Sequence, residues 1–317
     1  MKKLLFLGTP DVASLVLSCL LERERSEGFF SVVGVVSQPA ARSARRGGNL
    51  PSPVHALALQ NNLKVFTPEK ARDADFLQCV RDLAPDICVT AAYGNVLPDD
   101  FLMIPKFGTL NIHPSLLPRW RGAAPVQRSL EAGEVETGVS VLFTVKAMDA
   151  GPIVAQEKVC VGENECAPEL LSRLFSLGSS RLLAILPQVF SGSLVPTEQD
   201  VSMVTHAKKL DVSEGVLDFS REALTIHNKV RAFCGWPGTR AVFSIGGERV
   251  EMKVLKTRVG RNRIAPGSCV IAAGVIFVGC KDGSELEILE VQAPGKKAMS
   301  VRDFANGIRG KDLSIAI

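Results

Sequence analysis

Short β-rich runs alternate with helical patterns through the first half of the chain, and this alternation limits the folds open to it. Parallel strands need long crossover connections, which helices commonly supply. The sequence therefore predicts βαβ units on a mostly parallel, Rossmann-like α/β sheet. The predicted strands are Lys2–Gly8, Ser31–Ser37, Leu63–Thr67, Asp86–Tyr93 and Gly108–His113, with helices at Asp11–Glu24, Pro53–Gln60 and Asp73–Leu83.

The second half of the chain changes character. A length of 317 residues favours two domains. A hairpin-like strand pair at 139–145 and 153–161 and a helix at 168–190 complete a predicted first domain, residues 1–190. Residues 191–210 are the best linker candidate. Closely spaced short strands then predict that residues 211–317 form a small antiparallel, OB-like β-barrel.

Charge is unevenly distributed between these regions. Residues 1–190 hold 19 Lys+Arg and 19 Asp+Glu, whereas residues 191–317 hold 18 and 14, so the net charge of +4 arises entirely in the second region. A basic stretch is either a solvated face or a nucleic-acid interface, and charge alone leaves both open.

Membrane, disulfide and metal signals are weak. No uninterrupted apolar run reaches the roughly 18 residues that a spanning helix needs, and Gly8-Thr9-Pro10 comes too early for a secretory signal. We therefore expect a cytoplasmic chain with no membrane partner. The eight scattered cysteines form no CxxC pair, which predicts reduced core thiols and no metal site. No long apolar surface stripe is evident, so we expect a monomer.

The turn after the first strand argues against a dinucleotide cofactor. Thr9 is predicted to cap the first helix, with Pro10 at its first position. Gly8-Thr9-Pro10-Asp11 lacks the GxGxxG glycines that let a pyrophosphate approach a helix N-terminus. A nicotinamide-dependent dehydrogenase is therefore disfavoured.

A long basic loop, Gln38–Pro53, joins a predicted strand to a helix on the side where open α/β sheets bind ligands. It carries Arg42, Arg45 and Arg46 beside Gly47 and Gly48. The composition suits a loop that orders on an anionic partner, and equally suits a solvated connection.

The segment richest in side chains suited to catalysis begins on the last predicted parallel strand. Asn111 and His113 lie two residues apart on this strand, so their side chains project to the same face. They lie at the carboxyl end of the strand, where active sites of such sheets collect. An amide donor and an imidazole can therefore converge on one small volume.

Motifs at three places resemble those of the folate-dependent formyltransferase family: Asn-Ile-His-Pro-Ser-Leu-Leu-Pro at 111–118, Arg-Gly-Ala-Ala-Pro at 121–125 and Met-Asp-Ala-Gly-Pro-Ile at 148–153. Other matching segments extend over nearly the whole chain and resemble the members of that family that formylate methionyl-tRNA. They are Gly-Thr-Pro-Asp at 8–11, Gln38-Pro39, Pro51–Val54, Ala92–Gly94 with Leu97-Pro98, Arg119–Arg128, Trp236-Pro237 and Pro294–Met299.

The resemblance implies a reaction and a catalytic set. A formyl group would pass from N10 of 10-formyltetrahydrofolate to the α-amino group of methionyl-initiator tRNA, and Asn111, His113 and Asp149 would catalyse the transfer in the first domain. A free α-amino group has a pKa of about 8, so we expect the main barrier at the tetrahedral, oxyanionic intermediate. Asn111 and His113 would donate to its oxygen, while Asp149 would orient His113 and relay a proton.

The resemblance also implies where the substrates bind. Folate would lie along Ser115, Leu116, Leu117 and Pro118, with residues 90–96 closing over the pterin. The loop with Arg42, Arg45 and Arg46 would contact the end of the tRNA acceptor stem, and the barrel, including Lys296 and Lys297, its inner side. The loop departs from the common Gln-Pro-Asp-Arg-Pro because this chain has Gln38-Pro39-Ala40-Ala41-Arg42, which makes Arg45 the candidate for the main loop arginine.

Other activities share the motif around residue 113. A formyltransferase acting on an amino sugar nucleotide or another small amine is the main alternative. A formyltetrahydrofolate hydrolase would need no basic barrel, and the intact Asn111, His113 and Asp149 argue against a non-catalytic RNA-binding protein. A single-domain glycinamide-type transferase would lack residues 210–317.

Overall fold

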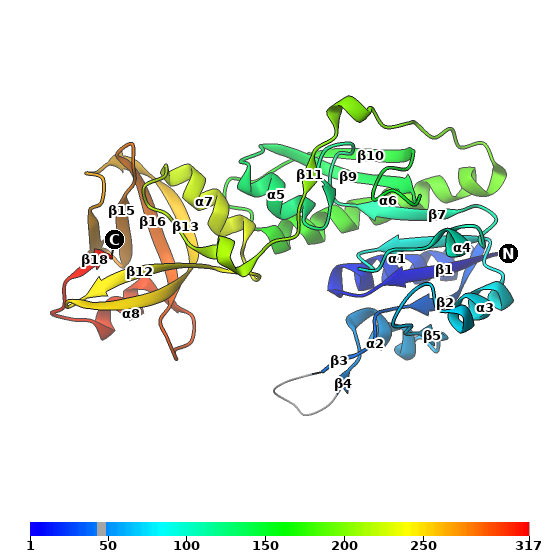
Figure 1. Ribbon diagram of the computed structural model, residues 1–317, viewed down its shortest axis with the longest axis horizontal. Coiled ribbons are helices and arrows are strands. Elements are labelled where there is room, and N and C mark those ends of the chain that lie inside the picture. Colours follow the sequence, from blue (N-terminus) through cyan, green and yellow to red (C-terminus); the bar gives the residue numbers. More distant parts are fainter. Residues whose placement is uncertain (43–48, 317) are drawn as a thin grey trace. The chain divides into compact units, whose positions relative to one another are not determined.

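The computed structural model describes residues 1–42 and 49–316, which fall into two compact units (Figure 1). The first unit comprises Met1–Gly122, Thr137–Val159 and Leu171–His206. The second comprises Ala123–Glu136, Cys160–Leu170 and the chain from Ala207 onward. The proposed boundaries at 190 and 210 follow the order of the chain, whereas the contacts also assign two earlier segments to the second unit.

A seven-stranded sheet organises the first unit, in the order β10-β9-β7-β6-β1-β2-β5 (Figure 1). Its strands are β1 (Lys2–Gly8), β2 (Phe30–Val36), β5 (Val65–Phe66), β6 (Ile87–Ala91), β7 (Thr109–His113), β9 (Glu136–Phe143) and β10 (Ile153–Cys160). β5, β2, β1, β6 and β7 pair in parallel, and β9 pairs antiparallel with β7. Every residue of β6 is buried, as expected for a parallel strand covered on both faces. The predicted Rossmann-like sheet is confirmed.

Helices of the first unit connect these strands. They are α1 (Asp11–Glu27), α2 (Pro53–Gln60), α3 (Ala74–Leu83), α4 (Asp99–Leu102) and most of α6 (Ala167–Ser191), while β3 (Ala41–Arg42), β4 (Asn49–Leu50), β8 (Arg121–Gly122) and β11 (His206–Ala207) are short strands. The prediction that Thr9 caps α1 is wrong, because Pro10 occupies the N-cap position. The Thr9 hydroxyl instead donates to the carbonyl of Tyr93, at 3.0 Å.

The longest helix, α6, packs closely on the sheet. A Cβ on Gly178 would lie 2.5 Å from a methyl of Ile112 on β7 and 2.8 Å from a methyl of Val139 on β9. Although the sequence showed no uninterrupted apolar run, α6 is the one helix of the described residues with the length and hydropathy to cross a membrane. Its packing on the sheet is that of a core helix.

An antiparallel barrel forms the larger part of the second unit, with sheet order β14-β15-β16-β13-β12-β18 and β17 paired to β16 (Figure 1). The end strands β14 and β18 approach one another, so the predicted barrel is confirmed and nearly closed. Its strands are β12 (Thr239–Ile245), β13 (Glu248–Arg263), β14 (Cys269–Ala272), β15 (Val275–Gly279), β16 (Ser284–Gln292), β17 (Met299–Ser300) and β18 (Leu313–Ile315). The helices α5 (Pro125–Glu131), α7 (Ala223–Ala232) and α8 (Val301–Gly307) belong to the same unit, with 3-10 turns at Val201–Met203 in the first unit and Val212–Gly215 in the second.

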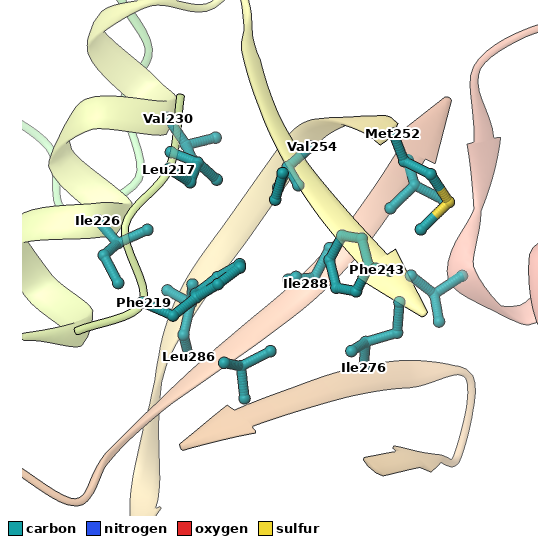
Figure 2. Close-up of a cluster of buried hydrophobic side chains, with 14 of the residues drawn as sticks. Leu217, Phe219, Ile226, Val230, Phe243, Met252, Val254, Ile276, Leu286 and Ile288 are labelled. Carbon is teal, nitrogen blue, oxygen red and sulfur yellow. The ribbon is translucent and has the colours of Figure 1, made fainter. Parts of the chain in front are cut away.

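The barrel interior is apolar. Figure 2 shows one buried cluster that includes Phe243, Met252 and Ile288 from three strands, with Phe219 and Ile226 from the segment that contains α7. All eight cysteines are free, but only Cys88 and Cys280 are buried and Cys160 is exposed. The expectation of core thiols therefore holds for two of them.

A buried polar cluster joins α7 to other parts of the second unit. His227 is 4% exposed, and its Nε2 donates to the Glu163 carbonyl while its Nδ1 accepts from the Thr257 hydroxyl, both at 3.0 Å. Burial lowers the pKa of His227, the Glu163 carbonyl opposes this shift, and the nearby charge of Arg231 adds to it. The ring is therefore held neutral.

Acid should destabilise this cluster. Because the folded-state pKa of His227 lies below its ordinary value of 6.5, the unfolded chain binds the proton first as the pH falls. The stabilisation is complete above pH 6.5 and declines below it, by at most about 1.4 kcal/mol per pH unit. Urea unfolding at pH 7.5 and 5.5 should show a smaller pH effect in His227→Gln than in the wild type. An equal pH effect in both proteins would contradict this assignment.

Gly178→Ala should destabilise the first unit, although alanine normally stabilises a helix relative to glycine by up to about 1 kcal/mol. The added methyl overlaps Ile112 and Val139, and such overpacking costs about 1–3 kcal/mol. Thermal unfolding measures the change. Gly307→Ala is the matched control, because Gly307 lies in α8 with open space around its Cβ position, and it should be neutral or slightly stabilising.

Candidate active site

The carboxyl ends of β1, β2 and β6 are tied together by side-chain hydrogen bonds. The Tyr93 carbonyl accepts from the Thr9 hydroxyl and from the Gln38 side-chain amide, at 3.0 and 3.2 Å. The Thr9 hydroxyl in turn accepts from the Gln38 backbone N–H, at 3.4 Å. Gly94 follows with φ +84°, and a Cβ there would lie 2.9 Å from the Gln38 amide nitrogen. The segments that follow β1, β2 and β6 are therefore held against one another at this edge of the sheet.

β7 carries Asn111 and His113 to the same edge. Asn111 is aligned with Thr90 of β6 and Leu142 of β9, and His113 is opposite Ser140. Asn111 is half-buried, and its side-chain amide has no hydrogen-bond partner within residues 1–42 and 49–316. It is therefore free to donate to a bound molecule.

His113 is buried between two fixed groups. Its Nε2 lies 3.0 Å from the Trp120 carbonyl, and its Nδ1 lies 3.6 Å from Oδ2 of Asp149. A carbonyl oxygen only accepts, so Nε2 carries a proton. The contact with Asp149 becomes an ion pair when the ring carries both protons. The ring orientation is thus set by the backbone of one loop and the carboxylate of another.

Asp149 is held in an unusual backbone conformation. Its φ is +51°, in the left-handed region, and the facing loop has Trp120 at +64° and Gly122 at +125°. Its Oδ2 also accepts from the Gly122 N–H at 2.8 Å. Non-glycine residues in this region cost about 1–3 kcal/mol and persist where surrounding contacts determine the conformation. Asp149 therefore bridges His113 and the loop that follows it.

Segment 115–118 is held by side chains of strands β9 and β10. Ser140, fully buried on β9, donates to the Ser115 carbonyl at 2.7 Å and accepts from the Leu117 N–H at 3.1 Å. Gln156 on β10 donates to the Leu117 carbonyl and to the Ser140 hydroxyl, at 2.8 and 2.9 Å. Ser115 and Leu117 are buried, whereas Leu116 and Pro118 stay partly accessible. These two side chains are the ones that remain available to a ligand.

The residues expected to contact tRNA belong to two other segments of the chain. Arg42 belongs to β3, where its backbone pairs with Asn49 of β4, and Arg45 and Arg46 lie outside the described residues. Lys296 and Lys297 are exposed in the turn between β16 and β17. Gln292 donates to the Lys296 carbonyl at 2.8 Å, which gives that turn a defined shape.

Several polar residues of the site had no signal in the sequence. Gln199 and Thr205 fall in the region assigned to a linker, and Ser140 and Gln156 lie on strands without a polar motif. No cluster of three or more His, Cys, Asp or Glu side chains suited to a metal ion occurs in the described part of the chain.

Comparison with known proteins shows the family to which the chain belongs. Residues 2–186 match the family model described as formyl transferase, and residues 209–309 match the formyl transferase C-terminal domain. The chain is 36% identical over 305 residues to a methionyl-tRNA formyltransferase of Parvibaculum lavamentivorans, covering 96% of each protein. It is 38% identical over 312 residues to one of Acidithiobacillus ferrooxidans, covering 97% of this chain and 96% of that one.

Solved structures share the fold at low sequence identity. An N-formyltransferase from Helicobacter canadensis, solved with folinic acid and dTDP-3-aminofucose, superimposes with a TM-score of 0.66 at 17% identity over 92% of this chain and 100% of that one. The sugar 3N-formyl transferase WlaRD gives 0.68 at 16% identity over 94% and 99%. With both family models matched over most of its length, the chain belongs to the formyltransferase family and is an enzyme of the transferase class.

Proposed function

We propose that this chain transfers the formyl group of 10-formyltetrahydrofolate to the α-amino group of methionyl-initiator tRNA. The observation that carries the proposal is the cluster of Asn111, His113 and Asp149 at one sheet edge, in a chain similar over 96% of its length to a methionyl-tRNA formyltransferase. Transfer to an amino sugar nucleotide has the support of fold alone, since those structures are 16–17% identical.

The reaction forms one bond and breaks one. The neutral amine attacks the formyl carbon, the N10–carbon bond of the tetrahedral intermediate breaks, and one proton passes from the attacking nitrogen to N10. The unpartnered amide of Asn111 donates to the developing oxyanion, and the His113 ring joins it when its Nε2–H leaves the Trp120 carbonyl. Asp149 fixes the ring through Nδ1 and offers its carboxylate for the proton in transit.

The folate donor fits the rim of this cluster. Leu116 and Pro118 offer apolar contact after β7, and the exposed Ala92 and Gly94 offer backbone groups after the neighbouring strand β6. Pterin recognition needs such an apolar slot edged by backbone donors and acceptors. Segment 115–118 and the strand end 90–96 therefore bind the folate in this proposal.

The tRNA contacts belong to the basic regions. Arg42, Arg45 and Arg46 would meet the acceptor end, while Lys296, Lys297 and the barrel would contact phosphates of the stem with salt-sensitive affinity. Residues 1–190 act as the catalytic domain, 191–210 as a linker and 211–317 as the tRNA-binding domain. Because translation initiation takes place in the cytoplasm, the enzyme would act there. We expect it to act as a monomer.

The direct test is formyl transfer itself. Purified protein is incubated with 10-formyltetrahydrofolate and methionyl-initiator tRNA, and formylmethionine is measured after deacylation. We expect turnover with the initiator and little with elongator methionyl-tRNA, free methionine or an amino sugar nucleotide. Asn111→Ala should lower kcat by about 10²–10³, because one oxyanion donor is lost. Turnover with the amino sugar alone would support the alternative substrate.

Ser140→Ala should weaken folate binding as well as the fold. The substitution leaves the buried Leu117 N–H without its acceptor and removes the donor to the Ser115 carbonyl, which costs about 1–3 kcal/mol. We expect a lower melting temperature and a higher KM for 10-formyltetrahydrofolate. Ser180→Ala, which removes an exposed hydroxyl bonded within α6, is the control and should leave both unchanged. An unchanged KM in folded Ser140→Ala would argue against folate binding along 115–118.

A further inference from the structure

A segment beyond α6, residues 197–205, lies against both loops that hold His113. Thr197 exchanges two backbone hydrogen bonds with Ile153, each 2.8 Å, directly after the Asp149 turn. At the other end, Thr205 accepts from the Trp120 N–H through its hydroxyl and from the Arg121 N–H through its carbonyl, both at 2.9 Å. All these residues belong to the first unit. The segment therefore supports the site rather than only leading away from it.

Gln199 is the central residue of this segment. Its amide nitrogen donates to the carbonyls of Asp149 and Gly151, at 2.8 and 2.7 Å. Its amide oxygen accepts from Nε and Nη2 of Arg121, at 3.0 and 2.7 Å. Both hydrogens of the amide and both acceptor positions are thus used. One side chain joins the Asp149 turn to the Arg121 loop.

The Asp149 turn needs such support. Asp149 has a left-handed backbone. The two carbonyls that Gln199 bonds, those of Asp149 and Gly151, lie on either side of Ala150 in this turn. If these two bonds are lost, the backbone can relax toward more favourable dihedrals, and the carboxylate then moves relative to His113. The same loss frees Arg121, whose neighbours Trp120 and Gly122 contact His113 and Asp149.

We propose that Gln199 is a positioning residue for formyl transfer, which sets the geometry of Asp149 against His113 by clamping the two loops that carry their partners. The inference rests on the proposed function, because it assumes that the Asp149–His113 pair acts in the reaction. Gln199 would influence Asp149 and His113 through its bonds to the Asp149 and Gly151 carbonyls and to Arg121.

Two substitutions separate the contacts of Gln199. Gln199→Glu keeps an acceptor for Arg121 but loses both donors to the turn, and Gln199→Met keeps much of the volume and loses all four bonds. We expect kcat to fall about 10- to 100-fold in each, because small displacements of a catalytic group have effects of that size. The KM values for folate and tRNA should change less than about threefold, since the substrate-binding surfaces are untouched.

NMR gives a readout that mere destabilisation would not change. The chain has only four histidines, so the ring resonances of His55, His113, His206 and His227 can be assigned separately. In both Gln199 variants, recorded well below the melting temperature, the His113 ring resonances should shift while those of His55 and His227 stay. The matched control is Asn61→Ala, which removes an amide bond to the Leu57 carbonyl in the same unit and should leave kcat and all four rings unchanged.

Asp149→Asn is measured alongside, so that the two hypotheses fail separately. If Asp149→Asn loses activity while both Gln199 variants keep wild-type kcat and His113 resonances, the positioning role is overturned and the catalytic assignment stands. If Asp149→Asn keeps wild-type kcat, the catalytic assignment is overturned and the role of Gln199 in transfer falls with it. Loss of kcat in Gln199→Glu and Gln199→Met, with an unshifted His113 ring, would also contradict the positioning role.

Discussion

The register of β7 between β6 and β9 is the constraint on which the site depends. Side chains alternate along a strand, so a slip of one residue would turn Asn111 and His113 to the opposite face. Ile112, between them, lies against Gly178 of α6, where there is no room for a side chain. The apolar contact on one face thus fixes the polar pair on the other. The packing of α6 and the orientation of Asn111 and His113 are two consequences of the same strand pairing.

Above the sheet, the site is held by hydrogen bonds between segments far apart in sequence. Asp149 and Trp120 keep left-handed backbones, which isolated turns would rarely adopt. Each is bonded on two sides: Asp149 by Gly122 and Gln199, Trp120 by His113 and Thr205. The free-energy cost of the strained dihedrals is offset by contacts that form only when both loops are in place, which favours a single arrangement of His113 and Asp149.

The sequence predicted the sheet, and the edge of it at which Asn111 and His113 lie, because both follow from local periodicity and the geometry of parallel strands. The spacing of Asn111 and His113 placed them on one face, and Asp149 stood out only through the family resemblance. Gln199 and Ser140 could not be found in this way, since their partners lie 16 to 78 residues away in the chain. Thr9 was misplaced because a hydroxyl before a helix can cap it or bond elsewhere, and here the Tyr93 carbonyl is the partner.

In the second unit, fewer basic side chains are available to a partner than a count along the sequence suggests. Strand β13 contains six basic residues and two acidic ones, Glu248 and Glu251. In the barrel, Arg258 pairs with Glu287 directly across from it on β16, and Arg240 of β12 reaches Glu251. Antiparallel pairing thus brings acidic side chains from other strands beside basic ones. The attraction for phosphate therefore depends on where cations outnumber these cross-strand partners, and the exposed turn with Lys296 and Lys297 is such a place.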